Sequence, residues 1–200
     1  MLEAVDLECR RGGRTLFRGL SFPLKGGELL RVGGANGSGK TSLLRILCGL
    51  LSPASGEVRW RGAPIQHLRE EYSRELAYLG HAAALKDDLT PEENLRIAAS
   101  LSGMRISSGE TREALSRFHV PDLPVRKLSQ GQKRRAALAR LALSAQAPLW
   151  LLDEPFTALD ASGIDLLKTL IKGHVGRGSI VVYTTHQDPG LSATRVLELA

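Results

Sequence analysis

The chain reads Gly34-Ala35-Asn36-Gly37-Ser38-Gly39-Lys40-Thr41 between a short apolar run and a leucine-rich stretch. This spacing fits the pattern G-x-x-x-x-G-K-[ST], in which glycines let successive backbone N–H groups curl around a phosphate. A helix expected from Ser42 to Leu50 would point the positive end of its dipole at that anion. Lys40 can reach the β- and γ-phosphates, and the Thr41 hydroxyl can ligate Mg²⁺. The stretch predicts a nucleoside triphosphate site, against the alternative of a flexible glycine turn.

Apolar patterns on both sides of this stretch predict the sheets that hold it. Leu29, Leu30 and Val32 form a short strand that leads into the loop. Apolar and polar residues alternate in three other stretches, which predict a small antiparallel sheet over Val5–Cys9, Leu20–Leu24 and Val58–Trp60. Continuous apolar runs predict buried parallel strands at Leu149–Leu152 and Ile180–Tyr183. Strands that alternate with helices indicate an α/β fold with a parallel sheet.

The middle of the chain has a different pattern. One helix begins near Pro91 and a second is expected from Glu110 to Phe118, with polar turns and prolines between them. A longer helix is expected from Ser129 to Leu143. We predict a single domain over residues 1–200. Residues of about 1–85 and 133–200 form the core with its β-subdomain, and residues of about 86–132 form a helical subdomain.

Two acids follow the apolar run Leu149–Leu152. Carboxylates at the carboxyl edge of a parallel sheet lie beside a phosphate loop when both belong to the same fold. Asp153 is then placed to organise the Mg²⁺ shell, and Glu154 to orient or deprotonate an attacking water. The alternative is an acidic turn after a strand.

A third motif begins the longest expected helix and reads Leu128-Ser129-Gln130-Gly131-Gln132. A serine and a glycine at a helix N-terminus can bind a second anion. Because the chain already has one full phosphate site, a second makes most sense if it serves a nucleotide held by another copy. An ordinary N-cap is the alternative.

Bulk composition excludes several classes. The formal charge is +6, but the basic residues are scattered and aromatic residues make up only 4%, too few for a base-stacking platform, so we expect no nucleic-acid partner. No apolar run approaches the roughly 18 residues of a membrane span, and no signal peptide is visible, which predicts a cytoplasmic chain. Cys9 and Cys48 are expected to be inert, and His67, His119 and His174 to be solvated.

The motifs occur together in the order typical of the ABC ATPases: the phosphate loop, LSQGQ, LWLLDEP, FTALD over residues 156–160, and TTH ending at His186. The resemblance covers essentially the whole chain. It implies a P-loop NTPase (RecA-like) core with an N-terminal antiparallel β-subdomain and an inserted helical subdomain. It also implies that the chain binds ATP and Mg²⁺ and hydrolyses ATP.

The same resemblance implies a head-to-tail dimer, with itself or with a second ATPase copy. Each ATP would lie between Lys40 of one subunit and Ser129 and Gly131 of the other, with Gln132 in the same signature motif. His186 would contact the γ-phosphate, whereas taken alone it could simply be a histidine that ends a buried strand.

The chain departs from the ABC pattern at two places. His81 stands where that family usually carries a glutamine, on a coupling loop that senses the γ-phosphate and faces a membrane partner. The apolar residues 82–85 beside it are expected to dock that partner, unless they are internal packing. No aromatic stands where the family usually stacks one on adenine. Arg11 and Phe17 are both open candidates.

Longer stretches are similar to the ATP-binding subunit of the cytochrome c maturation (haem exporter) family. They include RGGRTLFRGLSF, YLGH followed by LTPEENL, LSQGQKRRAALARL, LDEPFTALD and TTHQ. This resemblance implies a haem-transporting type of ATPase, peripheral on the cytoplasmic face of the bacterial inner membrane, with an integral membrane permease subunit as partner. The alternatives are a transporter for a different substrate, a soluble ABC ATPase, and a P-loop kinase or GTPase.

Overall fold

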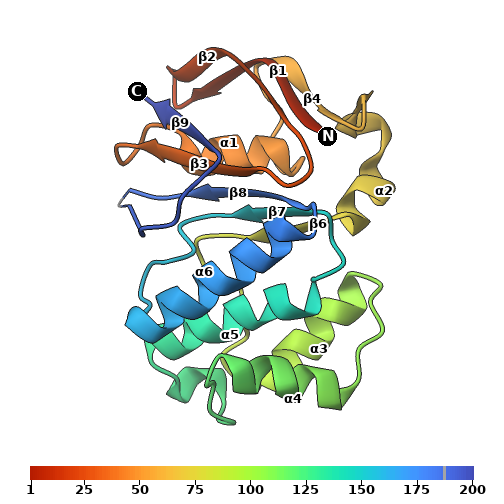
Figure 1. Cartoon of the computed structure of the whole chain (residues 1–200), viewed down its shortest axis with the longest axis vertical. Coiled ribbons are helices and arrows are strands. Elements are labelled where there is room, and N and C mark those ends of the chain that lie inside the picture. Colours follow the sequence, from red (N-terminus) through yellow and green to blue (C-terminus); the bar gives the residue numbers. More distant parts are fainter. Residues whose placement is uncertain (187) are drawn as a thin grey trace.

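A computed structural model describes residues 1–186 and 188–200; Gln187, the last residue of the quoted TTHQ, lies outside them. An antiparallel sheet has the strand order β2-β1-β4-β5 and a parallel sheet the order β6-β7-β8-β3-β9. Figure 1 shows the antiparallel sheet at one end of the molecule, the parallel sheet in the middle and the long helices beyond it. The expected α/β architecture with an N-terminal antiparallel subdomain is confirmed.

The antiparallel sheet is built around β1. Its strands are β1 (Leu2–Arg11), β2 (Arg14–Leu24), β4 (Ser55–Trp60) and β5 (Ala63–Pro64). A bulge at Asp6, where φ is 46°, shifts the register between Ala4 and Leu7. The expectation that Val5 shares a buried face with Leu7 was therefore wrong: Leu2 and Ala4 are buried before the bulge, and Leu7 and Cys9 after it.

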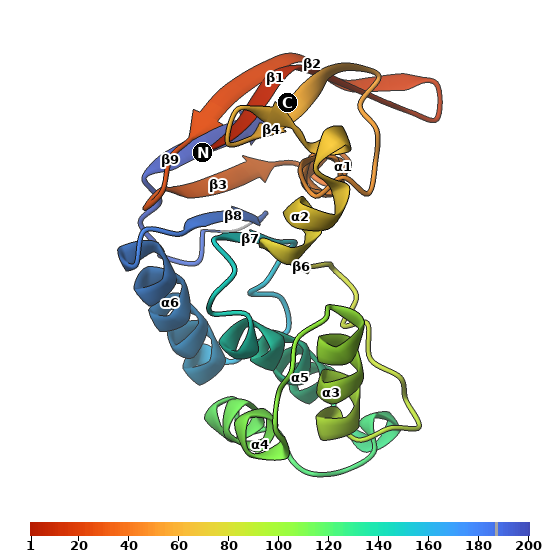
Figure 2. The same cartoon turned by 90° about the vertical axis from the view of Figure 1, so that its right-hand side faces the viewer.

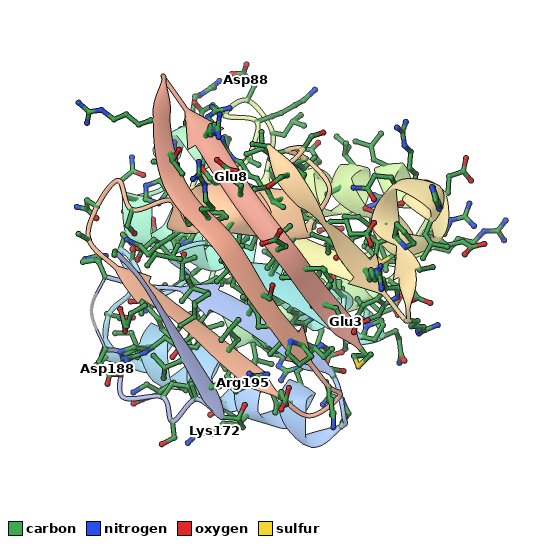
Figure 3. All side chains as sticks on the ribbon, turned by 90° about the horizontal axis from the view of Figure 1, so that it is seen from above. Glu3, Glu8, Asp88, Lys172, Asp188 and Arg195 are labelled. Atoms are coloured by element: carbon green, nitrogen blue, oxygen red, sulfur yellow. The ribbon has the colours of Figure 1, made fainter. Side chains whose placement is uncertain are left out.

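Glu8 is a polar position of the alternating stretch Val5–Cys9, yet it is buried in this sheet. Its carboxylate accepts hydrogen bonds from Arg10 and Arg18, and these bonds lower the pKa of Glu8. Figure 3 looks down on the sheet and places Glu8 along β1. The sequence alternation misassigned this residue because a buried carboxylate is tolerated once it is paired.

The parallel sheet contains β6 (Leu76–Leu79), β7 (Leu149–Leu152), β8 (Ile180–Thr184), β3 (Leu29–Gly34) and β9 (Arg195–Leu199). Both faces of β7 are covered: Leu149 and Leu151 enter one apolar cluster, and Trp150 and Leu152 enter the other. This explains why the strand is apolar at every position. The sequence patterns predicted neither β6 nor β9.

The helix after the phosphate loop is α1 (Lys40–Leu47). Its inner face buries Leu43, Leu44 and Leu47 between the two sheets. The helix ends with Cys48 as C-cap, and Gly49 follows with φ 75°, as a left-handed C-terminal residue requires. The expected helix extended to Leu50, but Leu50 is 68% exposed because the helix has already ended.

Four longer helices lie on the far side of the parallel sheet, and Figure 2 shows α5 and α6 against it with α3 and α4 farther out. They are α3 (Pro91–Leu101), α4 (Ser108–Arg117), α5 (Gln130–Leu143) and α6 (Ala161–Gly176). The short α2 (Arg69–Arg74) lies on the side of α1, where Tyr72 donates to the Leu47 carbonyl. There are 3₁₀ turns at Ile65–His67 and Val125–Lys127. The patterns missed α2 and α6. Within the described residues, no helix has both the length and the apolar content needed to cross a membrane.

His174 on α6 corrects another expectation. It was expected to be solvated, but its side chain is fully buried and its ring stacks on Trp150 with centroids 3.7 Å apart. Burial lowers the pKa of His174 to about 4, and the nearby Arg177 charge acts in the same direction. His67 and His119 are exposed.

Candidate active site

The phosphate loop connects β3 to α1. Its glycines adopt backbone angles that other residues rarely reach, with φ 133° at Gly34 and 103° at Gly39. A Cβ on Gly34 would lie 2.4 Å from the Leu199 carbonyl oxygen, so β9 leaves no room for a side chain. The buried Lys40 curls back, and its Nζ donates to the carbonyls of Gly34 at 2.8 Å and Ala35 at 3.0 Å. Neutral carbonyl oxygens are weak acceptors for the Lys40 ammonium group, so the oxygens of a bound anion can replace them.

Asp153 lies at the carboxyl end of β7, beside this loop. Thr41 Oγ1 donates to both Asp153 carboxylate oxygens, at 3.1 and 3.0 Å. Thr184, at the end of the neighbouring strand β8, donates to Asp153 Oδ1 at 2.8 Å. The sheet therefore brings together the loop threonine and the acid that the sequence placed 112 residues apart. A hydroxyl and a carboxylate are hard oxygen donors of the kind that Mg²⁺ prefers.

Glu154 has an unusual backbone conformation, with φ 47°. This left-handed region costs a residue other than glycine about 1–3 kcal/mol and persists only where the surroundings hold it. The Glu154 N–H donates to Thr184 Oγ1 at 2.8 Å. The carboxylate is mostly buried, and its Oε2 lies 3.0 Å from Nδ1 of His186. The turn therefore aims the acid at the space above the phosphate loop.

A cavity of about 450 Å³ unites these groups. Its lining includes Lys40, Thr41, His81, Glu154 and His186. The structure thus gathers the phosphate loop, the second acid and both histidines singled out by the sequence around one space. The lining comes from β2, the phosphate loop, α1 and the segments that follow β6, β7 and β8.

The signature residues lie elsewhere. Ser129 is the N-cap of α5, and its hydroxyl accepts from the Gln132 N–H while the Gln132 side chain accepts from the Ser129 N–H. Of the described residues that line the cavity, none comes from the stretch 128–132. The start of α5 faces the FTALD segment instead, where a Cβ on Gly131 would lie 3.1 Å from the Ala158 carbonyl oxygen. Within one chain this motif is an N-cap, and its service to a second chain stays a prediction.

The FTALD segment is tied to α5 by an ion pair. Arg135 Nη2 lies 2.5 Å from Asp160 Oδ1. Asp160 also caps α6 through the Gly163 N–H. The Arg135 hydrogen bond, followed by the cap, lowers the pKa of Asp160 to about 2. The segment after Asp153 and Glu154 is therefore fixed between two helices.

Sequence reasoning missed some residues of the site. Thr184 was quoted only as part of TTH, yet it contacts both acids, and nothing in a lone threonine signals this. Leu16 lines the cavity, and a Cβ on Gly39 would lie 3.1 Å from Leu16 Cβ and 3.2 Å from Phe17 Cδ1. Arg11 and Phe17 were the two candidates for stacking on adenine. Phe17 lies against the phosphate loop, whereas Arg11 is exposed at the end of β1.

The apolar patch expected beside His81 divides into two halves. Ala83 and Leu85 are half-buried and pack against the helical side of the core. Ala82 and Ala84 are exposed. Internal packing therefore accounts for part of the Leu85 side chain, and docking of a partner at this patch stays a prediction.

Known proteins resemble this chain over its whole length. A protein called cytochrome c biogenesis ATP-binding export protein CcmA from Aromatoleum aromaticum is 52% identical, with 100% of this chain and 95% of that protein covered. Proteins with the same name from Dechloromonas aromatica and Salmonella typhi are 51% and 47% identical, over 100% and 97% of this chain and 98% and 94% of their own lengths.

Solved structures agree with the fold. A putative ABC transporter ATP-binding protein from Pyrococcus furiosus superposes with a TM-score of 0.83 at 25% identity, covering 99% of this chain and 96% of its own. The ATP-binding cassette MJ0796, in a dimeric post-hydrolysis state bound to ADP and Pi, gives 0.83 at 25% identity and covers 100% of this chain and 94% of its own. The family described as ABC transporter matches residues 17–157. The chain therefore belongs to the ABC transporter family, and within it groups with the proteins named CcmA.

Proposed function

We propose that this chain binds Mg-ATP, hydrolyses it, and supplies the energy for a membrane complex of c-type cytochrome biogenesis. The observation that carries the hydrolytic part is the cavity in which Lys40, Thr41, Glu154 and His186 meet. Lys40 of the phosphate loop, the Thr41 hydroxyl and the Glu154 carboxylate line it, and the buried Asp153 accepts from that hydroxyl behind the lining. A phosphate-binding site without hydrolysis would need only the first of these.

The residues act in a definite order. ATP phosphates bind the backbone N–H groups of the loop, and Lys40 exchanges its two carbonyl acceptors for phosphate oxygens. Thr41 and Asp153 would hold Mg²⁺, since their oxygens already face each other. A metal ion held by these two residues would supply positive charge against the negative charge that develops on the phosphate during hydrolysis.

Glu154 would orient the attacking water and accept its proton, with its carboxylate aimed into the cavity by the strained turn. His186 Nδ1 lies 3.0 Å from that carboxylate and lines the same cavity, where it would contact the γ-phosphate. His81 lines the same space from the end of β6, where it is placed to report nucleotide occupancy to the coupling loop.

A second chain would complete the site. Ser129, Gly131 and Gln132 lie outside the cavity of their own chain and would close over the nucleotide of a partner copy in a head-to-tail dimer. The similar MJ0796 cassette is itself a dimer in its post-hydrolysis state with ADP and Pi, which supports this arrangement.

The biological role rests on the relatives. Their name, cytochrome c biogenesis ATP-binding export protein, supports a role in export during cytochrome c biogenesis. For this role we propose a place on the cytoplasmic face of the bacterial inner membrane beside an integral permease subunit, with haem as the transported group. The chain would then act as a haem-transporting ATPase. A transporter of the same type with a different substrate is the alternative.

Hydrolysis is tested by Glu154→Gln, which keeps the shape of the side chain and removes the base. We expect unchanged ATP binding and a rate of hydrolysis that falls by about 10²-fold or more. Glu113→Gln on the exposed face of α4 is the matched control and should hydrolyse ATP like the wild type. Full turnover by Glu154→Gln would overturn the assignment.

The biological role is tested in a bacterium that makes c-type cytochromes. Loss of the gene should abolish covalently bound haem in those cytochromes, as seen by haem staining of membranes. Wild type should restore the stain and Glu154→Gln should not. A normal stain without the gene would favour the alternative transporter.

A further inference from the structure

One buried arginine joins three parts of the site. Arg134 lies on α5, and only 6% of its surface is exposed. Its Nη1 donates to the carbonyls of Gly80 at 3.1 Å and His81 at 3.2 Å, and its Nη2 to those of Asp153 at 2.9 Å and Glu154 at 2.6 Å. A single guanidinium thereby links the signature helix, the start of the coupling loop and the acid pair.

The two pairs of carbonyls have different roles. Gly80 and His81 follow β6 and lead out toward the helical subdomain. Asp153 and Glu154 follow β7, the neighbouring strand, and Glu154 carries the strained φ of 47°. Its N–H is held by Thr184 and its carbonyl by Arg134. Hydrogen bonds on both sides therefore fix the backbone conformation of Glu154. One of the two partners, Arg134, also donates to the coupling loop.

Burial of this cation has a clear physical cost. Desolvation lowers the pKa of Arg134, while the nearby Asp153 and Glu154 charges oppose that shift. An arginine needed only to anchor a helix could remain at the surface with its stem packed. Here the charged head is taken inside, where four carbonyl oxygens and two carboxylates compensate it.

We propose that Arg134 is a positioning residue for hydrolysis: it sets the backbone of Glu154 according to the position of the Gly80–His81 loop. The inference rests on the proposed ATPase function. When the loop shifts, the Nη1 contacts move the guanidinium plane, and the rigid fork carries this movement to the Nη2 contacts with Asp153 and Glu154. Catalysis then depends on where the coupling loop lies, although Arg134 contacts neither nucleotide nor water.

The fork geometry makes the proposal specific to arginine. A lysine at this position has one ammonium, which cannot span both pairs of carbonyls. A glutamine offers a single NH₂ group and no charge. Both substitutions should leave the nucleotide-binding residues in place while they release the backbone of Glu154.

The experiment compares Arg134→Lys and Arg134→Gln with Arg140→Gln. Arg140 is a second partly buried arginine on the same helix, and burial also lowers its pKa. For each purified full-length variant, thermal unfolding gives the fraction folded, ATP titration gives Kd, and steady-state assays give kcat and KM. Hydrogen exchange by mass spectrometry follows peptides that cover residues 76–86 and 150–158.

We expect kcat to fall by about 10²-fold in both Arg134 variants, because a small misplacement of a reacting group costs this much. Kd and KM should stay within about threefold of wild type. Exchange should rise in both peptides together, since the Asp153 N–H donates to the Leu79 carbonyl and the Glu154 N–H to Thr184. Arg140→Gln should show none of these changes.

An unchanged kcat in a folded Arg134→Lys chain would overturn the proposal. It would also be overturned if kcat fell only in proportion to ATP binding or to the fraction folded, which is what a merely structural arginine predicts. If Arg134→Gln does not fold, the kcat of Arg134→Lys alone tests the proposal. ATPase activity of the wild-type chain is measured first. Its absence would contradict the proposed function itself rather than the role of Arg134.

Discussion

Thr184 shows how much one small side chain can do in this site. Its hydroxyl donates to the Asp153 carboxylate and accepts from the Glu154 N–H, so one atom fixes the metal-type acid and the candidate base at once. It is fully buried at the end of β8. Without this hydroxyl, the Glu154 N–H would lose its acceptor and the Asp153 carboxylate one of its donors.

Thr184→Val keeps the shape of the side chain and removes its hydroxyl. We therefore expect the free energy of unfolding to fall by about 1–3 kcal/mol through the lost hydrogen bonds. Its ATPase rate should fall as well, because Glu154 loses one of the two hydrogen bonds that hold its strained backbone. Urea unfolding and kcat measure the two effects. Thr184→Ser keeps the hydroxyl and should resemble wild type; equal defects in both variants would show that the methyl group matters instead.

His174 predicts a pH dependence of stability. Its pKa is lowered to about 4 in the folded chain, against about 6.5 for an unperturbed histidine. Below the unfolded value, the unfolded chain takes up a proton that the folded chain refuses, so stability present above pH 6.5 is lost as the pH falls toward 4. The loss reaches at most about 3 kcal/mol.

The test compares wild type with His174→Phe, whose ring can still stack on Trp150 but does not titrate. Arg177 is the charged neighbour that faces the imidazole and is kept in both chains. Urea unfolding at pH 7.5 and pH 5 should show a larger loss for wild type. Parallel losses in the two chains would assign the pH dependence to other groups.

At the scale of elements, three helices begin with the same N-terminal capping motif. Capping boxes begin α3 at Thr90, α4 at Ser107 and α5 at Ser129, each with a side chain three residues later that returns the bond. An identical local role makes Ser107 a control for Ser129, because Ser107 lies in the helical part and does not line the nucleotide cavity.

We expect Ser107→Ala and Ser129→Ala to lose the same stability, about 1 kcal/mol. For a domain of this size that corresponds to a fall in Tm of about 2–4 °C. Only Ser129→Ala should also lose ATPase activity, because only that cap would meet the nucleotide of a second chain. Thermal unfolding and ATPase assays distinguish the roles, and equal activity in the two variants would leave Ser129 as a cap alone.

At the scale of the whole molecule, the signature motif lies outside the cavity of its own chain: of the described residues that line it, none belongs to 128–132. A head-to-tail dimer would solve this geometric problem, and it can be tested with two inactive chains. Lys40→Ala damages the phosphate grip, and Ser129→Arg blocks the signature. In a mixed dimer both lesions fall in one composite site, and the other site is intact.

Mixing the two chains should therefore restore partial ATPase activity, to a level set by the fraction of mixed dimers and by any need for cooperation between sites. Lys40→Ala mixed with Glu154→Gln is the control, because both lesions act on the nucleotide of their own chain and every site keeps one of them. Recovery in the control to the same extent would contradict the composite site.

The amino-acid sequence by itself determined the motifs, the α/β class and the family resemblance, which the comparisons confirm. Glycine spacing, apolar runs and helix caps are features of neighbouring residues. Steric and hydrogen-bonding preferences of those residues therefore suffice to predict the loops, strands and helix starts. Leu149–Leu152 is the clearest example, since its expected bounds are those of β7.

The tertiary structure decided what depends on contacts between distant segments. The bulge at Asp6 reversed the expected face of Val5, and a cluster of arginines made Glu8 a buried residue. His174 became a core residue because Trp150, on another element, supplies a flat apolar partner. Arg134 became the link between coupling loop and acid pair because two neighbouring parallel strands end at its guanidinium. Such long-range pairings carry no local periodicity, so only the folded chain reveals them.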